Sequence, residues 1–291
     1  NNHWTFDARL SNIGTDGYID RASVDLNSYY LQGGYFAENT SVKLIAFAGK
    51  EKTYHAWGYA TKEEMEKFGR RYNPCGEMYT DADGNKHYYT DQTDNYLQKN
   101  YQLLLNHSFS TAWNLNVALH YTKGDGYYEE YKPGSSLVEY GLKPFNPDGT
   151  ETNESDLVRQ KKMDNKFGGG VFSLNYTGNR LTASLGGGLN QYRGNNFGKV
   201  TWVKNYIGNL SPEHEYYRNK SKKTDGNIYL KANYDLTSTL SAYADLQYRH
   251  IDYTIDGVND KYDWNKNALR PLAVDKKFDF FNPKVGLNWN I

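Results

Sequence analysis

The sequence of 291 residues has one cysteine, a small apolar fraction and no long hydrophobic run. Because Cys75 is the only cysteine, it forms neither an intrachain disulfide nor a cysteine-based metal cluster. Apolar residues make up 38% of the chain, below the roughly 45–50% typical of globular domains. No segment approaches the roughly 18 apolar residues of a membrane-spanning helix. These shortages exclude a disulfide scaffold and a helical membrane protein.

The chain also has no excess of positive or negative charge, because 34 Lys and Arg residues balance 34 Asp and Glu residues. Without a basic tract, nucleic acid is not an expected partner. The seven histidines show no i, i+4 metal spacing, and no Ser/His/Asp arrangement can be argued from their order. We therefore expect no catalytic residue, no metal site and no cofactor, and we do not expect an enzyme.

Aromatic residues, in contrast, are abundant, with 28 Tyr, 6 Trp and 12 Phe. A content of 16% argues against disorder, the usual explanation of low hydrophobicity, because disordered chains have few aromatics. Tyrosine and tryptophan are enriched where a membrane protein crosses the boundary between lipid and water.

The chain has a rhythm of paired segments in which apolar and polar residues alternate. Short connections at 37–40, 110–112, 177–180 and 235–238 join the members of each pair. Long polar and aromatic stretches at about 51–96, 128–164, 194–223 and 254–277 separate the pairs. This order predicts an all-β chain, a transmembrane antiparallel up-and-down β-barrel with long external loops. A soluble β-sandwich is the competing interpretation, but its strands are more uniform and its loops follow no strict short and long order.

About ten strands are expected, at 4–10, 26–36, 42–54, 96–109, 113–127, 167–176, 181–192, 227–234, 240–253 and 278–289. Successive side chains of a strand point to opposite faces, so each alternating strand has an apolar and a polar face. The polar faces of two strands are predicted to line a wet lumen, with candidates Asn114, Asn116, Asp245, Gln247 and Arg249. Thr61 followed by Glu64 fits a capping box and predicts one or two helical turns at 61–68.

Two other motifs have structural interpretations. The glycine triplets at 168–170 and 186–188 lack phosphate-loop spacing, and glycine within a strand marks a bend or a close backbone approach. The Asp-rich segment at 81–85 resembles the start of a calcium loop, but Lys86 and Gln92 occupy the positions that require Gly and Glu. A turn built on Asp-Gly is the favoured interpretation, although weak calcium binding to the loop oxygens stays open.

The long loops combine aromatic residues with hydrogen-bonding groups, as recognition surfaces do. The alternative role for each of these residues is packing within the loops or a membrane-boundary girdle. The ligand-binding candidates are Tyr54, His55, Trp57, Tyr59, Tyr128, Tyr131, Trp202, Tyr217, Arg218 and Trp264.

Five segments together carry a resemblance to a known family. They are Asp16-Gly17-Tyr18-Ile19-Asp20-Arg21-Ala22, Gly49-Lys50-Glu51-Lys52-Thr53-Tyr54-His55-Ala56-Trp57, Tyr72-Asn73-Pro74, Thr93-Asp94-Asn95-Tyr96-x-Gln98-x-x-Tyr101-Gln102-Leu103 and Phe281-Asn282-Pro283-Lys284-Val285-Gly286-Leu287-Asn288-Trp289. In this order, along the whole chain, they resemble the barrel of TonB-dependent outer-membrane receptors of the Bacteroidetes type.

The resemblance implies a 22-stranded barrel closed by an N-terminal plug, in the outer membrane of a Gram-negative bacterium. The implied partners are the TonB complex, outer-membrane lipid and a small imported ligand, with a ferric siderophore, haem or cobalamin favoured. The sequence shows no plug and no TonB-contacting segment, so we expect residues 1–291 to be an internal portion of the barrel.

Three alternatives stay open at this point. A glycan importer of the same family suits the aromatic loops equally well. A soluble or surface-exposed β-rich binding module would fold without detergent. An outer-membrane barrel enzyme would need catalytic residues at the loop side, and the sequence offers no convincing set.

Overall fold

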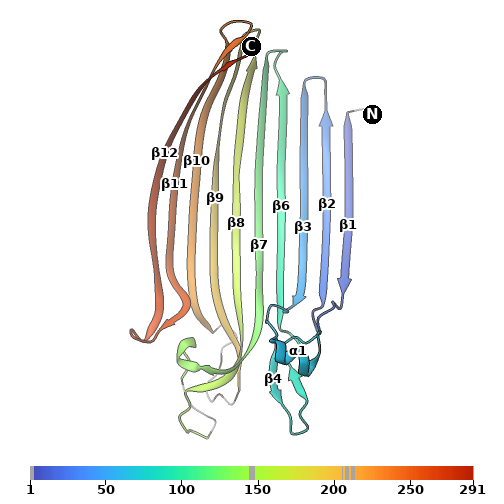
Figure 1. Ribbon diagram of the computed structural model, residues 1–291, viewed down its shortest axis with the longest axis vertical. Coiled ribbons are helices and arrows are strands. Elements are labelled where there is room, and N and C mark those ends of the chain that lie inside the picture. Colours follow the sequence, from blue (N-terminus) through green and yellow to red (C-terminus); the bar gives the residue numbers. More distant parts are fainter. Residues whose placement is uncertain (1–2, 144–147, 205, 207–209, 211–213, 291) are drawn as a thin grey trace.

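The computed structural model describes residues 3–143, 148–204, 206, 210 and 214–290, and most of them form one large antiparallel sheet (Figure 1). Its ten strands follow each other in sequence order, so each strand pairs with its neighbours along the chain. They are β1 (Trp4–Thr15), β2 (Val24–Phe36), β3 (Thr40–Tyr54), β6 (Thr93–Ser108), β7 (Trp113–Ser136), β8 (Glu154–Thr177), β9 (Leu181–Val203), β10 (Glu215–Asp235), β11 (Leu240–Asp263) and β12 (Ala268–Trp289). The predicted all-β, up-and-down order of about ten strands is confirmed.

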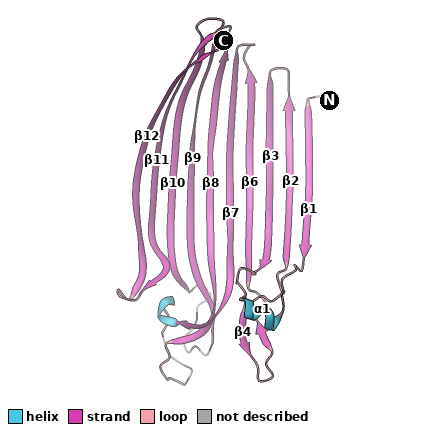
Figure 2. Ribbon diagram, in the orientation of Figure 1, coloured by secondary structure: helices cyan, strands magenta, loops and turns pink. Residues whose placement is uncertain are grey.

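Tight turns join the strands at one end of the sheet, and long connections lie at the other end (Figures 1 and 2). The amide of Ala37 donates to the carbonyl of Thr40 at 2.8 Å, and Gly178 donates to Leu181 at the same distance. The polar connections at the opposite end hold the short elements α1 (Lys62–Phe68), β4 (Glu77–Thr80), β5 (Lys86–Tyr88) and the 3₁₀ helix η1 (Leu137–Tyr140). We call these two ends the turn end and the loop end.

The strands are longer than the alternation in the sequence predicted. The longest, β7, β8 and β11, have 24 residues each, which corresponds to about 80 Å of extended chain. Together with β9, β10 and β12, they continue through parts of the segments expected as loops at 128–164, 194–223 and 254–277. The physical reason is that both faces become polar toward the loop end, so the alternation fades although the backbone pairing continues. Parts of the 128–164 and 194–223 segments lie outside the described residues.

The two faces of the sheet differ sharply in character. Direct cross-strand partners share a face, and one such row runs through Leu105, Val117 and Phe172. We call the face that carries this row the apolar face and the opposite one the polar face. On the apolar face Leu44 is 62% and Leu189 is 61% exposed. A sheet with such exposed leucines needs an apolar surrounding, because soluble proteins rarely leave contiguous apolar surface uncovered.

Aromatic side chains border the apolar face at the turn end. Trp4 packs on Tyr35 with ring centroids 4.8 Å apart, and Trp113 packs on Tyr176 at 4.9 Å. Trp289 at the end of β12 is also exposed. This arrangement matches the aromatic girdle expected where a sheet crosses the boundary between lipid and water.

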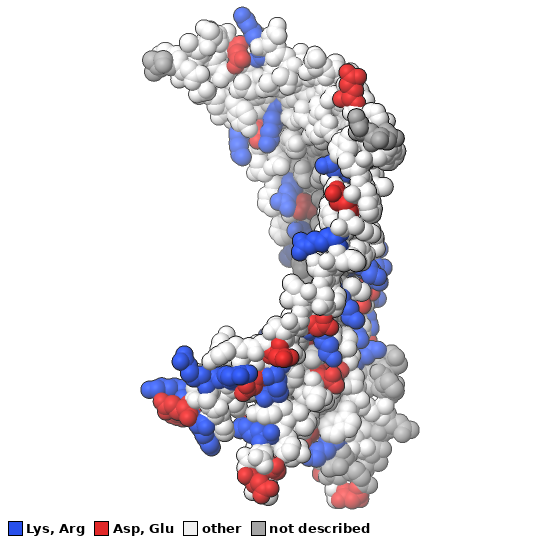
Figure 3. Space-filling view, turned by 90° about the vertical axis from the view of Figure 1, so that its right-hand side faces the viewer, with Lys and Arg blue, Asp and Glu red and all other residues white. Residues whose placement is uncertain are grey.

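The polar face is the more sheltered of the two. Asn100 and Asp245 on this face are only 9% and 7% exposed. In side view, the molecule is deeply hollowed on one side (Figure 3).

The hydrophobic core of the described protein is small and lies at the loop end, where Leu137, Tyr140, Leu157, Val200 and Tyr216 pack together.

The helix and turn predicted in the first long loop are both confirmed. Thr61 caps α1, since its hydroxyl accepts from the Glu64 amide at 3.2 Å while the Glu64 carboxylate accepts from the Thr61 amide at 2.8 Å. The Asp81 carboxylate accepts from the amides of Asp83 and Asn85 and closes the β4–β5 turn. In the described part of the chain, no helix is both long and apolar enough to cross a membrane.

Candidate functional site

The five predicted lumen residues lie on the same polar face, although they come from β7 and β11. The register shows this directly, since Asn114, Asn175, Ser184, Lys231 and Asp245 are successive cross-strand partners across β7 to β11. Within a strand, every second side chain shares a face. The other three candidates, Asn116, Gln247 and Arg249, therefore join the same face. Whether this face lines a channel stays a prediction.

Side-chain amides and hydroxyls on the polar face form a continuous hydrogen-bonded ladder. Asn106 Nδ2 donates to Asn116 Oδ1 at 2.5 Å, and Asn116 Nδ2 donates to Ser173 Oγ at 3.3 Å. Asn175 Nδ2 also donates to Ser173 Oγ, and Ser184 Oγ donates to Asn175 Oδ1 at 2.5 Å. Such a satisfied network holds its side chains in place and presents a neutral polar wall.

Charged pairs continue this wall over β10 and β11. The Arg249 guanidinium reaches both carboxylate oxygens of Asp225, at 2.9 and 2.5 Å, which is a bidentate geometry. Lys231 Nζ lies 3.9 Å from Asp245 Oδ2, which also accepts from the Tyr243 hydroxyl at 3.1 Å. The cations of this region are therefore matched by acids on the same face.

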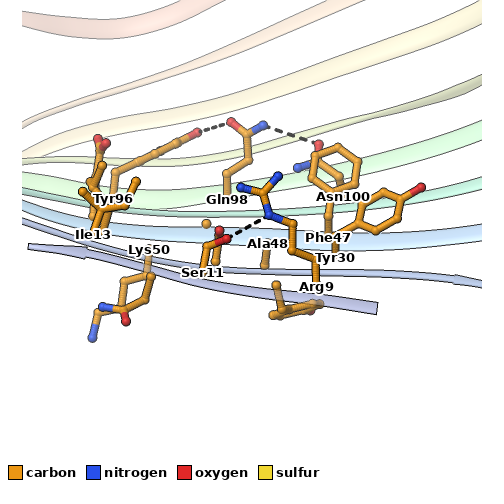
Figure 4. Close-up of a pocket in the computed structure, with 16 residues that line it drawn as sticks. Arg9, Ser11, Ile13, Tyr30, Phe47, Ala48, Lys50, Tyr96, Gln98 and Asn100 are labelled. Carbon is orange, nitrogen blue, oxygen red and sulfur yellow. Dashed lines mark hydrogen bonds between the residues drawn. The ribbon is translucent and has the colours of Figure 1, made fainter. Parts of the chain in front are cut away.

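A shallow cavity of about 530 Å³ lies on the polar face between β1 and β6 (Figure 4). Within it, Arg9 Nε donates to Ser11 Oγ at 3.0 Å, and the Tyr96 hydroxyl donates to Gln98 Oε1 at 3.3 Å. Its lining includes Arg9, Tyr30, Phe47, Tyr96, Gln98 and Asn100. A guanidinium, amides and aromatic rings together can bind an anionic ligand with apolar parts. None of the lining residues of this cavity was among the site residues predicted from the sequence. The feature that could have pointed to it is the alternation of Asp7, Arg9 and Ser11, which places polar side chains on one face of β1.

Both glycine triplets lie inside strands, as predicted, and both allow close backbone approach. A Cβ atom on Gly169 would lie 2.3 Å from the carbonyl oxygen of Leu189, and one on Gly187 would lie 2.5 Å from that of Asn227. The triplets belong to β8 and β9 rather than to a loop that opens a helix, so a phosphate loop is excluded. Their effect is to let β8, β9 and β10 pack closely.

At the loop end, three of the predicted aromatic candidates form a cluster. The rings of His55 and Trp57 stack with centroids 3.8 Å apart. Tyr128 of β7 packs its edge against both, at 5.9 Å from His55 and 5.5 Å from Trp57. His55 is buried, whereas Trp57 is 52% exposed, so part of the indole is free to contact a ligand. We call these three residues the aromatic cluster.

Burial also sets the charge of the cluster. Desolvation lowers the pKa of His55 below its ordinary value of 6.5, and the carboxylates of Asp94 and Glu130 partly oppose this effect. Neither ring nitrogen of His55 has a hydrogen-bond partner among the described residues. The imidazole is therefore neutral at neutral pH.

The loop that carries the cluster is fastened by a buried asparagine. Asn73 Nδ2 donates to the carbonyls of Asp20 at 3.0 Å and His55 at 2.9 Å, and Asn73 Oδ1 accepts from the Cys75 amide at 3.0 Å. Beside it, the Arg21 guanidinium lies 3.4 Å from the ring centroid of Tyr88. Asn73 therefore ties the first two loops together under the cluster.

Four other candidates are engaged in packing within the protein. The Tyr54 hydroxyl is buried and donates to the carbonyl of Tyr89 at 2.9 Å. Tyr217 is part of the packed core at the loop end, and Tyr131 stacks on Trp202 at 6.3 Å. For these residues, the structure favours a role in shaping the loops.

Three candidates stand apart from the cluster. Arg218 pairs with Glu215 and lies 4.2 Å from the ring centroid of Phe197 on the apolar face. Tyr59 is 97% exposed, and Trp264 packs on Tyr262, at 4.9 Å between ring centroids, at the β11–β12 connection. These residues do not converge with the others on one surface.

The last features to place are the potential metal ligands and the single cysteine. No group of three or more His, Cys, Asp or Glu residues there is arranged to hold a metal ion. Cys75 is a free, buried thiol that accepts from the Gly58 amide at 3.2 Å.

Comparison with known proteins gives a family match. Residues 47–291 match the family model described as TonB dependent receptor-like, beta-barrel. A search of curated proteins found no match to this chain.

Solved structures share the fold at low sequence identity. The open form of the ferric-catecholate import receptor Fiu from E. coli K12 has a TM-score of 0.63 at 11% identity, covering 99% of this chain and 48% of that one. The ferripyoverdine receptor from the outer membrane of Pseudomonas aeruginosa has a TM-score of 0.59 at 14% identity, covering 99% of this chain and 36% of that one. The unliganded ferric citrate transporter FecA has a TM-score of 0.57 at 10% identity, covering 97% and 36%. The chain thus spans less than half the length of each of these structures.

Proposed function

This chain belongs to the TonB-dependent receptor β-barrel family, and we propose that it forms part of the wall of an outer-membrane receptor that imports a scarce ligand. The observation that carries this proposal is the sheet itself, with exposed leucines on one face and a sheltered, hydrogen-bonded polar face on the other. That distribution suits a strand wall between lipid and a wet interior.

For the ligand we propose a ferric siderophore or a related metal chelate such as haem or cobalamin. Support comes from similar structures, which are an import receptor for ferric catecholates, a ferric citrate transporter and a receptor bound to ferripyoverdine. Such chelates combine carboxylate or catecholate oxygens with flat organic parts. Arg9 with its neighbouring amides suits the oxygens, and the free face of Trp57 suits the flat parts.

The proposed mechanism is capture followed by gated passage. The loop end binds the ligand first, because it carries the aromatic cluster and the longest connections. The ligand then exchanges hydrogen bonds along the polar face, where the ladder through Asn116 and Ser173 offers donors and acceptors. A plug domain would gate the passage and the TonB complex would supply the energy. No covalent bond is broken, so no catalytic residue is required.

A glycan importer of the same family is the second candidate, and one observation favours it. The half-exposed Trp57, backed by His55 and Tyr128, is a platform on which a sugar ring can stack. We also propose that the receptor is of the Bacteroidetes type. This subtype rests only on the resemblance of the five sequence segments. A soluble β module is disfavoured because it would leave Leu44 and Leu189 in water.

The test is uptake by cells that carry or lack the full-length receptor. We expect deletion to abolish uptake of radiolabelled iron from one class of ferric siderophore under iron limitation. In the purified receptor, Trp57→Ala should weaken binding of that chelate roughly 3- to 10-fold, since one aromatic contact is lost. Trp264→Ala is the matched control and should leave affinity unchanged. Normal iron uptake with loss of growth on an oligosaccharide would instead establish the glycan importer.

A further inference from the structure

Five cations form a continuous row on the apolar face, one on each of five adjacent strands. In the register, Lys99 of β6 is opposite Lys123 of β7, which is opposite Lys166 of β8. The row continues through Arg193 of β9 to Lys222 of β10. With strands about 4.8 Å apart, it is about 20 Å long. We call these five residues the basic row. They are far apart in the sequence, so only the sheet register brings them together.

The basic row has no counter-charge within the described protein. All five side chains are exposed, and none forms an ion pair with a described residue; Arg193 donates only to Gln191, at 2.7 Å. Two cations elsewhere on the strands, Arg249 and Lys161, do form ion pairs, with Asp225 and Asp260 respectively. Like charges directly opposite each other in a sheet are unfavourable. The row is therefore a surface that an external anion would stabilise.

Two acidic residues lie near the row on the same face. Asp125 and Asp164 lie opposite each other, two residues closer to the loop end and on the same face. Neither carboxylate approaches Lys123 or Lys166 closely enough to form an ion pair in the described structure. The two acids therefore limit the basic surface on its loop side.

The turn side of the row has the composition of a membrane boundary. Two residues away from Lys99 and Lys123, Tyr101 and Tyr121 lie opposite each other, and Leu103 and Leu119 follow after two more residues. The order from cation to aromatic ring to aliphatic chain is the order in which a membrane protein meets headgroups, interface and hydrocarbon. Figure 3 shows Lys and Arg side chains gathered mainly in the half of the molecule nearer the long loops.

An apolar hollow lies directly below this boundary. Its cavity of about 560 Å³ is lined by Phe6, Leu31, Leu44, Tyr101, Leu103 and Leu119. It forms where the small residues Gly33 and Ala46 leave space between larger neighbours, and nothing lies within 4 Å of a Cβ built on Gly33. A hollow of this shape next to cations suits an amphiphile that has an anionic head and acyl chains.

We propose that the basic row binds the phosphate groups of an anionic outer-leaflet lipid whose acyl chains occupy the hollow beside Gly33. This proposal rests on the proposed membrane position of the sheet, but not on the identity of the imported ligand. Lysine ammonium groups attract phosphate as point charges, and Arg193 adds a planar donor pair that fits two phosphate oxygens. The length of the row allows more than one phosphate to bind at once, so a bisphosphorylated lipid is the best-matched occupant.

The experiment compares three forms of the full-length receptor reconstituted in vesicles of phosphatidylethanolamine with bisphosphorylated lipid A. The first is unaltered, and the second carries Lys99→Gln, Lys123→Gln and Lys166→Gln. The third carries Lys62→Gln, Lys261→Gln and Lys266→Gln, which remove the same charge from exposed positions at the loop end. Lipid A retained per receptor after detergent extraction is counted by native mass spectrometry.

We expect the row variant to retain at least fivefold less lipid A than the other two forms, and 10 mM inorganic phosphate to leave the retained lipid in place. A variant with arginine at the same three positions should restore retention, which separates charge from folding. Equal retention by all forms would overturn the proposal, as would displacement by inorganic phosphate, which would indicate a free-anion site. Ligand uptake is measured on the same variants; lipid retention without uptake would overturn only the proposed transport function.

Discussion

Leu44 and Ile45 are neighbours in β3 whose side chains belong to opposite faces of the sheet. Leu44 lies between Gly33 and Leu103 in the cross-strand register, whereas Ile45 lies between Gln32 and Gln102. One residue of sequence thus separates an apolar surrounding from a polar one, although both side chains are aliphatic. The pair therefore marks the two faces of the sheet at a single point in the chain.

The first prediction uses this pair. Leu44→Arg should destabilise the full-length receptor in lipid by roughly 2–4 kcal/mol, because a guanidinium would face hydrocarbon. Ile45→Arg should cost clearly less, because its surroundings are polar. Urea-induced unfolding in phospholipid vesicles measures both. An equal cost for the two variants would contradict the assignment of the faces.

A second prediction concerns the close approach of strands at the glycine triplets. Gly187→Ala should lower the free energy of unfolding by roughly 1–3 kcal/mol, because its Cβ would lie 2.5 Å from the Asn227 carbonyl oxygen. Gly49→Ala is the control, since nothing lies within 4 Å of a Cβ there. Unfolding of the refolded receptor in detergent gives both values. The idea fails if the two substitutions are equally well tolerated.

The third prediction concerns the buried asparagine beneath the aromatic cluster. Asn73→Ala should loosen the first long loop by roughly 1–3 kcal/mol, since the Cys75 amide and the carbonyls of Asp20 and His55 lose their partner. Limited proteolysis between residues 56 and 92 should accelerate, while unfolding of the sheet stays unchanged. Asn85→Ala, at an exposed hairpin turn, serves as the comparison and should leave cleavage as it was.

A fourth prediction follows from the lowered pKa of His55. Because the folded loop favours the neutral imidazole, its stabilising contribution is fully present above pH 6.5, the ordinary value for the unfolded chain, and is lost as the pH falls below it. Amide hydrogen exchange of residues 54–58 should therefore be faster at pH 5.5 than at pH 7.5, after correction for intrinsic rates. In His55→Phe this difference should disappear, and its persistence would assign the effect to another group.

Much of the fold could be predicted from local patterns. The alternation through Leu115, Val117 and Leu119, the short connection at 177–180 and the capping box at Thr61 are each contained in a few residues. The strand bounds were less accurate toward the loop end, where β7 continues to Ser136. There both faces carry polar side chains, so the pattern that reveals a strand in the sequence is lost.

The candidate site was predicted in part. The aromatic cluster contains three of the proposed ligand-binding residues. Tyr54 and Tyr217, in contrast, are buried at the loop end, and Tyr59 is exposed and apart from the cluster. Residue type shows that an aromatic side chain is suited to binding, but it does not show what already covers that side chain. The cavity beside Arg9 was missed because its lining comes from four strands and no single segment displays it.

The sequence by itself determined the all-β class, the turn end and loop end, and the side chains that share a face within each strand. These properties depend on a period of two residues and on local turns, so they need no knowledge of distant partners. The tertiary structure decided which strands meet in which register, and hence that Lys99, Lys123 and Lys166 form a row and that Tyr128 reaches His55. The reason is physical: register arises from hydrogen bonds and packing between segments far apart in the chain, and a shift of one residue would reverse both faces.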